Sequence, residues 1–344
     1  MRVGIVGATG YGGAELIRIL QSHPKFEIAA LYTSSRQGRD IHNHYPHLTG
    51  IIPLTLEEID PIKMAKDTDV VFLAVPTGIA SQLAPELLTA GCVVIDLTGD
   101  FRLKNTEDYE YWYKRKAAPK EWIEKAVYSL PELNRTSVKG SQFISNPGCY
   151  PTAALLGLAP LAKANILKEG SVIIDAKSGI SGAGQTVSLG NIYSELNENL
   201  KIYKVNGHQH IPEIEQMLKE MGYESPITFQ THLVPMTRGI MTTIYGTVEG
   251  KITEDELWQL YHDFYANEYF VRVRDKGIFP ATKEVAASNF CDIGIACDER
   301  TGRITIVSVI DNLMKGAAGQ AVQNANILFG FEESAGLKFS PMYP

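Results

Sequence analysis

The chain has 344 residues, of which 44% are hydrophobic and 21% charged, and its formal net charge is −7. Because one hydrophobic core rarely serves a chain of this length, two domains are expected. The negative charge and the lack of dense Lys/Arg runs argue against a nucleic-acid-binding protein, and no apolar run is long enough to cross a bilayer. The four cysteines form no CxxC pair, which favours a reducing, cytoplasmic setting.

The first predicted element is a buried strand over residues 3–6, which enters the glycine-rich turn GATGYGG and then a helix through Leu20. This arrangement is typical of dinucleotide-binding proteins, in which backbone N–H groups face a pyrophosphate. The spacing is G-x-x-G-x-G-G rather than G-x-G-x-x-G, so a tight turn without a ligand is the alternative. The candidate cofactor-binding residues of this turn are Gly7, Thr9, Gly10, Tyr11 and Gly12.

A second strand is predicted over residues 26–32, and the polar run TSSRQG follows it. An NAD enzyme usually places Asp or Glu here to bind the ribose 2′-hydroxyl. Serines and an arginine suit a 2′-phosphate instead, although a solvated loop has a similar composition. We therefore expect NADP(H) as the cofactor, with Ser34 and Arg36 as its ligands.

Further strands are predicted over residues 68–74 and 92–97, with a helix over 80–90 between them. Strands that alternate with helices predict a Rossmann-type, doubly wound parallel sheet, which binds ligands at the carboxyl ends of its strands. Val75 and Pro76 follow one such end and are candidate cofactor-binding residues. Arg102 follows the next and suits an anionic substrate, with a surface salt bridge as the alternative. Residues 105–125 are expected to form an excursion over the surface.

Cys149 lies in the stretch SNPGCYPTA, where a turn opens directly into a helix. Asn146-Pro147-Gly148 is typical of a turn, and Pro151 suits a first helical turn. At that position the helix N–H groups and dipole lower the pKa of a thiol, and the thiolate is a nucleophile. Cys149 is therefore a candidate catalytic nucleophile, with a small buried core cysteine as the alternative. Asn146 is a candidate substrate-binding residue.

Two later segments carry candidate site residues. A strand over residues 171–176 enters a Gly/Ser loop whose Ser178, Gly179 and Ser181 suit a phosphate or carboxylate, with a flexible linker as the alternative. The segment GHQHIPEIE offers His208, His210 and Glu213 before a helix through residue 220. Only two imidazoles are present and no zinc motif completes them, so an acid/base role beside a thiol is favoured over a metal.

The remaining chain predicts a second, α+β domain with a mixed, largely antiparallel sheet. Strands are expected over residues 227–234, 241–249 and 270–273, the last two in an antiparallel sheet, and a hairpin over 290–297 and 303–310. Arg238 lies in a turn and is a candidate ligand of a substrate carboxylate. A small-residue helix is expected from Asp311 through residue 329, returning to the first domain, with Asn312 as a candidate cofactor-binding residue. The predicted domains are 1–148 with 314–344, and 149–313.

Six motifs together resemble the N-acetyl-γ-glutamyl-phosphate reductase family: GATGYGGAEL, SNPGCYPTA, SGISGAG, GHQHIPEIEQ, HLVPMTRGI and DNLMKGAAGQA. The resemblance covers nearly the whole chain in the right order. It implies NADPH-dependent reduction of an acyl phosphate to an aldehyde in arginine biosynthesis, with Cys149 as nucleophile. It also implies His208 as the acid/base with Glu213 as its partner, His210 and Arg102 as substrate-binding residues, and a homodimer or homotetramer.

Two alternatives stay open. A related enzyme of lysine biosynthesis reduces an aminoadipyl phosphate carried by a small acidic protein, which calls for a basic rim that the net charge of −7 disfavours. The chain could also be an NADP-binding sensor that has lost catalysis, against which the intact Cys149, His208 and Glu213 argue.

Overall fold

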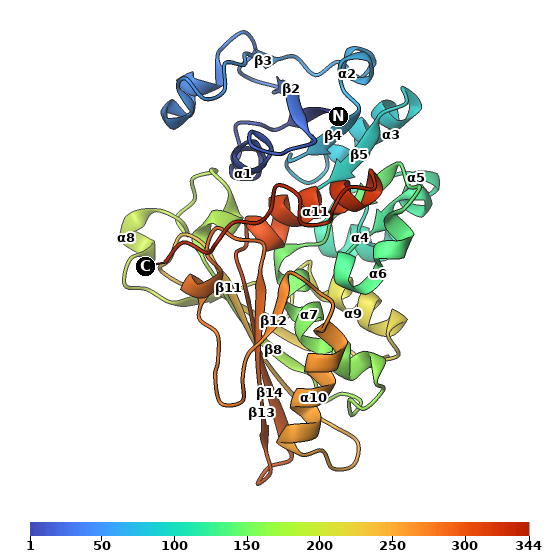
Figure 1. Ribbon diagram of the computed structural model, residues 1–344, viewed down its shortest axis with the longest axis vertical. Coiled ribbons are helices and arrows are strands. Elements are labelled where there is room, and N and C mark those ends of the chain that lie inside the picture. Colours follow the sequence, from blue (N-terminus) through green and yellow to red (C-terminus); the bar gives the residue numbers. More distant parts are fainter. Residues whose placement is uncertain (344) are drawn as a thin grey trace. The chain divides into compact units, whose positions relative to one another are not determined.

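A computed structural model describes residues 1–343 of the chain, which form two compact units. The first unit comprises Met1–Gly148 and Ala317–Lys338, and the second comprises Cys149–Gly316 and the residues from Phe339 onward. Each unit is built around its own seven-stranded sheet (Figure 1). None of the helices within residues 1–343 is both long and apolar enough to cross a membrane.

The sheet of the first unit is parallel throughout, with the strand order β3-β2-β1-β4-β5-β7-β6. Its elements are β1 (Arg2–Val6), α1 (Tyr11–Leu20), β2 (Glu27–Tyr32), β3 (Leu56–Glu57), α2 (Pro61–Asp67), β4 (Val70–Leu73), α3 (Ala80–Thr89), β5 (Val93–Asp96), α4 (Thr106–Tyr113), α5 (Lys120–Lys125), β6 (Val127–Tyr128), α6 (Pro131–Val138), β7 (Phe143–Ser145) and α11 (Gly319–Leu328).

Helices cover both faces of this first sheet. Strand residues Val71 and Leu73 share a core with α2 and α3, while α1 and α11 pack against each other and against β1 and β5. Every residue of β4 is inaccessible to solvent. A continuous apolar strand such as VVFL therefore forms here because both of its faces are buried, and the predicted Rossmann-type sheet is confirmed.

The sheet of the second unit is mixed, with the strand order β12-β13-β14-β11-β8-β10-β9. Its elements are α7 (Cys149–Lys163), β8 (Ile173–Ser178), α8 (Tyr193–Leu196), β9 (Lys201–Tyr203), α9 (Ile211–Glu220), β10 (Thr228–Leu233), β11 (Ile240–Thr247), α10 (Glu254–Tyr265), β12 (Val271–Val273), β13 (Cys291–Asp298) and β14 (Arg303–Ile310). The pairs β12–β13 and β8–β10 are parallel and the other four antiparallel, which confirms a mixed, largely antiparallel sheet.

Helix α7 is the central helix of the second unit, and residues 150–162 on it are all buried. It packs on β11 and β14, and α9 and α10 flank it on the same side of the sheet (Figure 1). Pro160 has no N–H to donate to the carbonyl of Leu156, and the hydroxyl of Tyr265 donates to that carbonyl instead. The proline is thus tolerated inside the helix because α10 supplies the missing donor.

Three local expectations differ from the structure. Residues 105–125 hold two helices rather than only a surface excursion, since Tyr109 is buried and donates to Asp100 at 2.8 Å. Strand β12 was expected to be antiparallel, but the chain crosses over through residues 274–290 and pairs it in parallel with β13. The last helix begins at Gly319 and not at Asp311, because a π-helical turn, η5 (Met314–Ala318), precedes it.

Candidate active site

The glycine turn of the first unit closes tightly between β1 and β4. Gly7 has a φ of 82°, and a Cβ added to it would lie 2.3 Å from the carbonyl oxygen of Ala74. A Cβ on Gly13 would lie 2.3 Å from the carbonyl oxygen of Gly7. Side chains at these two positions would therefore open the turn, which explains why the sequence has glycine there.

Helix α1 begins immediately after this turn, with Gly10 as its N-cap and no side-chain cap among the described residues. The first turn of α1 has no acidic residue, and Tyr11 is 40% exposed. Its leading N–H groups and the positive end of the helix dipole therefore face a region suited to an anion such as a pyrophosphate. Val75 and Pro76 follow β4 beside the turn, with the Val75 Cγ1 3.4 Å from the Cβ position at Gly7.

The polar loop after β2 is connected to the glycine turn by hydrogen bonds. Arg36 donates to His44 Nδ1 at 2.6 Å, and His44 Nε2 in turn donates to the carbonyl oxygen of Thr9 at 2.9 Å. Ser34 and Arg36 are both exposed. The structure thus brings the predicted 2′-phosphate ligands to the same edge of the sheet as the predicted pyrophosphate turn.

Asn146 and Arg102, both predicted to bind substrate, are buried in the first unit and bonded to the chain itself. Arg102 Nε donates to the carbonyl oxygen of Asn146 at 2.9 Å, and its Nη2 donates to that of Leu97 at 2.8 Å. The side-chain amide of Asn146 donates to the carbonyl oxygen of Ala317 at 3.1 Å. Their role as direct substrate ligands stays a prediction. The hydrogen bonds that the structure gives them stabilise the turn before Cys149.

Cys149 is the first residue of α7 and is partly exposed, as predicted for the end of a helix that carries a nucleophile. The main chain of Gly316 packs against it, since a Cβ at residue 316 would lie 2.7 Å from the Cβ of Cys149. The sequence analysis missed Gly316, and the only available signal was the GAAG run after Asp311. The main chain of residue 316 therefore lies directly against the Cβ of Cys149, and a larger residue there would displace the cysteine.

His208 lies in an aromatic pocket of the second unit. Its ring centroid is 5.5 Å from those of Tyr150 and Phe229 and 5.7 Å from that of Tyr203. Burial, with a smaller contribution from the Lys204 cation, lowers the pKa of His208 to about 3. His208 is therefore neutral at physiological pH.

The tautomer of His208 follows from its hydrogen bond. Nδ1 accepts the backbone N–H of His210 at 3.1 Å, so in the neutral ring the proton lies on Nε2, which is a donor. The two imidazole rings are 4.7 Å apart. His210 and Glu213 are also buried, and Glu213 lies in the first turn of α9. The three residues predicted from GHQHIPEIE are thus close neighbours.

Two tyrosines missed by the sequence analysis join this pocket. The hydroxyls of Tyr150 and Tyr203 are 2.9 Å apart. Burial raises the pKa of both phenols above their ordinary value, and the negative charge of the Cys149 thiolate adds to this effect. The sulfur of Cys149 therefore lies within electrostatic range of both hydroxyls, in the same unit as His208.

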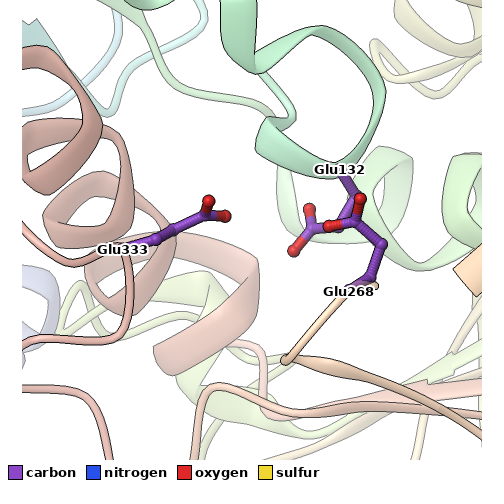
Figure 2. A group of neighbouring side chains, drawn as sticks. All are labelled: Glu132, Glu268 and Glu333. Carbon is purple, nitrogen blue, oxygen red and sulfur yellow. The ribbon is translucent and has the colours of Figure 1, made fainter. Parts of the chain in front are cut away.

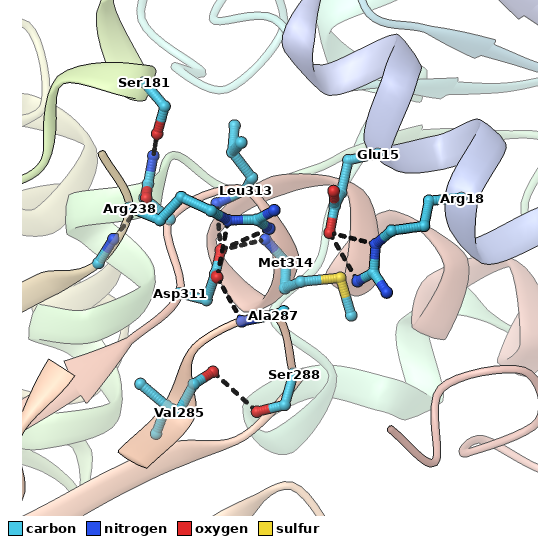
Figure 3. A network of polar contacts seen from close by, with 12 residues as sticks. Glu15, Arg18, Ser181, Arg238, Val285, Ala287, Ser288, Asp311, Leu313 and Met314 are labelled. Carbon is cyan, nitrogen blue, oxygen red and sulfur yellow. Dashed lines mark hydrogen bonds and ion pairs between the residues drawn. The ribbon is translucent and has the colours of Figure 1, made fainter. Parts of the chain in front are cut away.

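The turn between β10 and β11 is fixed by a polar network around Asp311, which follows β14 (Figure 3). The buried Asp311 carboxylate accepts two hydrogen bonds from Arg238, at 2.9 and 3.0 Å, and others from the N–H groups of Ala287, Leu313 and Met314. Arg238, predicted to bind a substrate carboxylate, is thus paired with a carboxylate of this chain. The sequence analysis did not predict this role of Asp311. The available signal was its position, since an aspartate commonly caps a helical turn by accepting the N–H groups two and three residues further along the chain.

The predicted cofactor ligand Asn312 is buried beside the same network. Its Oδ1 accepts the N–H of Gly239 at 2.8 Å, and its Nδ2 donates to Ser181 Oγ at 2.9 Å. Ser178 donates to the carbonyl oxygen of Gly179 at 2.8 Å, and a Cβ on Gly179 would lie 2.7 Å from the carbonyl oxygen of Thr237. Whether these four residues contact ligands stays a prediction. The structure brings Asn312 into hydrogen-bond contact with the loop that holds Ser178, Gly179 and Ser181.

Potential metal ligands do not gather around the two imidazoles. Within residues 1–343, His208 and His210 belong to no group of three candidate ligand side chains. Figure 2 shows three glutamates, Glu132 and Glu333 of the first unit and Glu268 of the second. In the first unit, Gln323 Nε2 donates to Glu132 at 3.0 Å and to Glu333 at 2.7 Å, so these two carboxylates are part of a hydrogen-bonded network.

Comparison with known families first defines the class. Residues 2–141 match the NAD-binding domain of semialdehyde dehydrogenases, and residues 149–312 match the dimerisation domain of the same enzymes. Aspartate semialdehyde dehydrogenase II from Vibrio cholerae has the same fold, with a TM-score of 0.72, 18% identity, and coverage of 96% of this chain and 98% of that chain. Aspartate semialdehyde dehydrogenase from Candida albicans, solved with NADP, has the same fold with a TM-score of 0.70 and 18% identity. That match covers 95% of this chain and 97% of that chain. The chain is an oxidoreductase of the semialdehyde dehydrogenase class with a nicotinamide-dinucleotide-binding domain.

Closer relatives define the family within this class. The chain is 57% identical to N-acetyl-gamma-glutamyl-phosphate reductase of Bacillus subtilis (strain 168) and 56% identical to that of Geobacillus sp. (strain WCH70). Both alignments span 345 residues and cover 100% of this chain and 100% of the relative. It belongs to the N-acetyl-gamma-glutamyl-phosphate reductase family.

Proposed function

We propose that the chain reduces N-acetyl-L-glutamyl 5-phosphate to N-acetyl-L-glutamate 5-semialdehyde and phosphate, using NADPH, as a step of arginine biosynthesis. The observation that carries this proposal is a cysteine at the first position of α7, followed by Tyr150, whose ring packs against the neutral, buried imidazole of His208. The chain is 57% identical to the N-acetyl-gamma-glutamyl-phosphate reductase of Bacillus subtilis. The finer points, which are the substrate, the preference for NADPH and the residue roles, rest on the arguments below.

The first unit is suited to the dinucleotide. The turn around Gly7 and Gly13 leaves no room for side chains, so its backbone can approach a pyrophosphate closely. The N–H of Gly10 closes the turn by donating to the carbonyl oxygen of Gly7 at 3.0 Å, so Tyr11 and Gly12 would present N–H groups to the pyrophosphate. The exposed Ser34 and Arg36 would bind the 2′-phosphate that distinguishes NADPH. When bound, NADPH supplies the hydride of the reaction.

Cys149 accounts for the release of phosphate. Its thiolate attacks the acyl carbon, the carbon–oxygen bond to phosphate breaks, and a thioester to Cys149 remains. A thioester accepts hydride far better than a carboxylate does, which is the chemical reason for covalent capture. The product of hydride transfer is a thiohemiacetal oxyanion on the same sulfur, and its collapse releases the aldehyde and regenerates the thiolate.

His208 is suited to that oxyanion. Its Nδ1 is engaged by the backbone N–H of His210, so Nε2–H is the atom that can donate to developing negative charge. Glu213 would fix the histidine pair, and His210, Ser178, Gly179 and Ser181 would bind the acyl phosphate. Donors held in place before the reaction cost no reorganisation when the charge appears.

One assay tests reaction and substrate together. Purified protein is given N-acetylglutamate semialdehyde, NADP⁺ and phosphate, and NADPH formation is followed at 340 nm. We expect phosphate-dependent turnover that NAD⁺ supports poorly. Turnover only with a carrier-protein-bound aminoadipyl substrate would support the lysine-biosynthesis alternative, and NADPH binding without turnover of either substrate would support the sensor.

We also propose that the chain is a homo-oligomer assembled through the sheet of its second unit. On β11, Ile240, Thr242 and Ile244 are buried, and Ile244 faces α7. Met241, Thr243 and Tyr245 point to the other face and are half-buried. That face, in a part of the chain matched by a dimerisation domain, suits a second copy.

Light scattering tests the oligomer. Thr243→Arg should lower the molar mass to that of a monomer, while Ile62→Arg, at a 67% exposed residue of the first unit, should not. An unchanged mass for Thr243→Arg would contradict the proposed surface.

We place the protein in the cytoplasm, which fits four cysteines that form no disulfide within residues 1–343.

A further inference from the structure

Helix α11 carries an unusual set of buried polar side chains. Gln320, Gln323, Asn324 and Asn326 are all inaccessible to solvent. Burying an amide costs free energy unless both its oxygen and its nitrogen form hydrogen bonds. The partners of each of these side chains therefore indicate what it holds in place. Asn324 is the one that reaches the turn before Cys149.

Asn324 is fully satisfied by two residues. Its Oδ1 accepts the hydroxyl of Ser129 at 2.6 Å, and its Nδ2 donates to the carbonyl oxygen of Ser129 and to Oδ1 of Asn146, both at 3.1 Å. A hydroxyl donor on one side and two oxygen acceptors on the other leave a single orientation of the amide. Asn324 therefore acts as a donor toward Asn146.

Asn146 is held at four atoms. Its N–H donates to the carbonyl oxygen of Asp96 at 2.8 Å, its own carbonyl accepts from Arg102, its Nδ2 donates to the carbonyl oxygen of Ala317, and its Oδ1 accepts from Asn324. Only Pro147 and Gly148 separate it from Cys149, and the proline has a fixed φ. The hydrogen bonds of Asn146 therefore fix the main chain three residues before Cys149.

We propose that Asn324 is a positioning residue for Cys149, which acts by holding the Asn146 side chain and with it the turn that leads into the nucleophile. The role rests on the proposed function, in which Cys149 forms the thioester. Asn324 does not touch the substrate in this proposal. Its contribution is to keep the thiol where the N–H groups of α7 and the reacting carbon can meet it, and misplacement by an ångström costs about 100-fold in rate.

The same helix offers a matched control. Asn326 is equally buried, but its amide bonds His23 and the carbonyl oxygens of Glu333 and Ala335, away from the turn. Loss of either amide removes comparable hydrogen bonds from the first unit. The variants Asn324→Ala and Asn326→Ala should therefore lower the melting temperature by similar amounts, which isolates the effect on the thiol.

The test uses the full chain and measures alkylation of Cys149 by iodoacetamide across pH, quantified by peptide mass spectrometry, together with kcat, KM for NADPH and melting temperature. We expect Asn324→Ala to lower the alkylation rate of Cys149 and kcat about tenfold or more, to raise the pH of half-maximal alkylation, and to leave KM for NADPH within about threefold. Asn326→Ala should leave alkylation and kcat within about threefold.

A milder variant keeps the test decisive if Asn324→Ala does not fold. Ser129→Ala removes the hydroxyl that orients Asn324 and should change alkylation and kcat in the same direction by a smaller factor. If the Asn324 and Ser129 variants lose stability while alkylation and kcat stay at wild-type values, the proposal is wrong. Alkylation needs no substrate, so failure of the proposed reaction itself would appear separately, as a wild-type protein without turnover.

Discussion

The two sheets of this protein have the same number of strands and opposite exposure patterns. The parallel sheet has helices on both faces, and a strand such as β4 is inaccessible along its whole length. The mixed sheet has α7, α9 and α10 on one face, and β11 alternates buried and half-buried residues. The first sheet is therefore covered on both faces, whereas the second keeps a half-buried face, to which we propose that a second copy binds.

The candidate ligands of the two units differ in the same way. The first unit offers backbone N–H groups in a turn where side chains do not fit. The second offers side chains, a thiol at a helix start and an imidazole in an aromatic pocket. We propose dinucleotide binding by the first unit and bond making by the second, and four changes test this proposed division.

The largest effect is expected from Cys149→Ala. Without the thiol no thioester forms, so kcat should fall by about four orders of magnitude or more, as for other covalent nucleophiles. The dissociation constant for NADPH, measured by fluorescence titration, should stay within about threefold. Comparable activity in this variant would end the covalent mechanism, and lost NADPH binding would contradict the division between the units.

A smaller effect separates the two histidines. His208→Asn removes the Nε2–H donor and should lower kcat by about 100-fold to 1,000-fold, far more than His210→Asn. Because burial holds the pKa of His208 at about 3, the kcat profile of the wild-type enzyme should show no inflection near 6.5 from this ring. Steady-state kinetics between pH 5 and 9 check both points, and a larger loss in His210→Asn would exchange the two roles.

Substitution of Arg36 should change cofactor preference without changing the chemistry. Arg36→Ala removes the cation proposed to meet the 2′-phosphate, so KM for NADPH should rise about tenfold while KM for NADH stays nearly constant. Arg2→Ala is the control, because Arg2 starts β1 and so lies at the opposite end of that strand from the glycine turn. Equal losses with both cofactors would contradict the 2′-phosphate role.

The smallest effect concerns stability against pH. Burial lowers the pKa of His23, whose Nδ1 accepts the N–H groups of Lys25 and Phe26 at 3.1 Å and whose Nε2 bonds Asn326 and Ala335. The unfolded chain then gains a proton before the folded one, so this contribution is complete above pH 6.5 and is lost as pH falls below it.

Hydrogen exchange measures this loss in each unit separately. Between pH 7.5 and 5.5 we expect the first unit to lose protection because of this residue, and His23→Gln to flatten the dependence. His262→Gln, at a half-exposed ring of the second unit, serves as the control. The same pH dependence in His23→Gln and wild type would remove His23 as its cause.

Much of the fold follows from local patterns in the sequence. Apolar strands alternating with helices predicted the parallel sheet, and the Pro-Gly turn before Pro151 predicted that Cys149 would begin a helix. The parallel pairing of β12 was not predictable, because it depends on a crossover of residues 274–290 rather than on the strand itself. Helix α10 was overlooked despite a capping box formed by Thr253 and Glu256.

The candidate site residues that the sequence suggested are those whose type and local spacing carry a signal, such as Cys149 and the two histidines, and their roles stay predictions. Pairs of residues that lie far apart in the sequence carry no such signal. The partner of Arg238 is Asp311, 73 positions away, and that of Asn146 is Asn324, 178 positions away. Such pairs form only once the chain has folded, so single-sequence patterns contain no trace of them.

The π-helical turn at Met314–Ala318 decides which main-chain atoms lie against Cys149. Its N–H at Gly316 donates to the carbonyl of Asp311, five positions back, so the turn contains one residue more than α geometry would need. Removing one residue would shift those after it by about 100° around the helix axis, and residue 316 would no longer present its main chain to residue 149. A deletion in this turn should therefore change the surroundings of the thiol without any change to the cysteine itself.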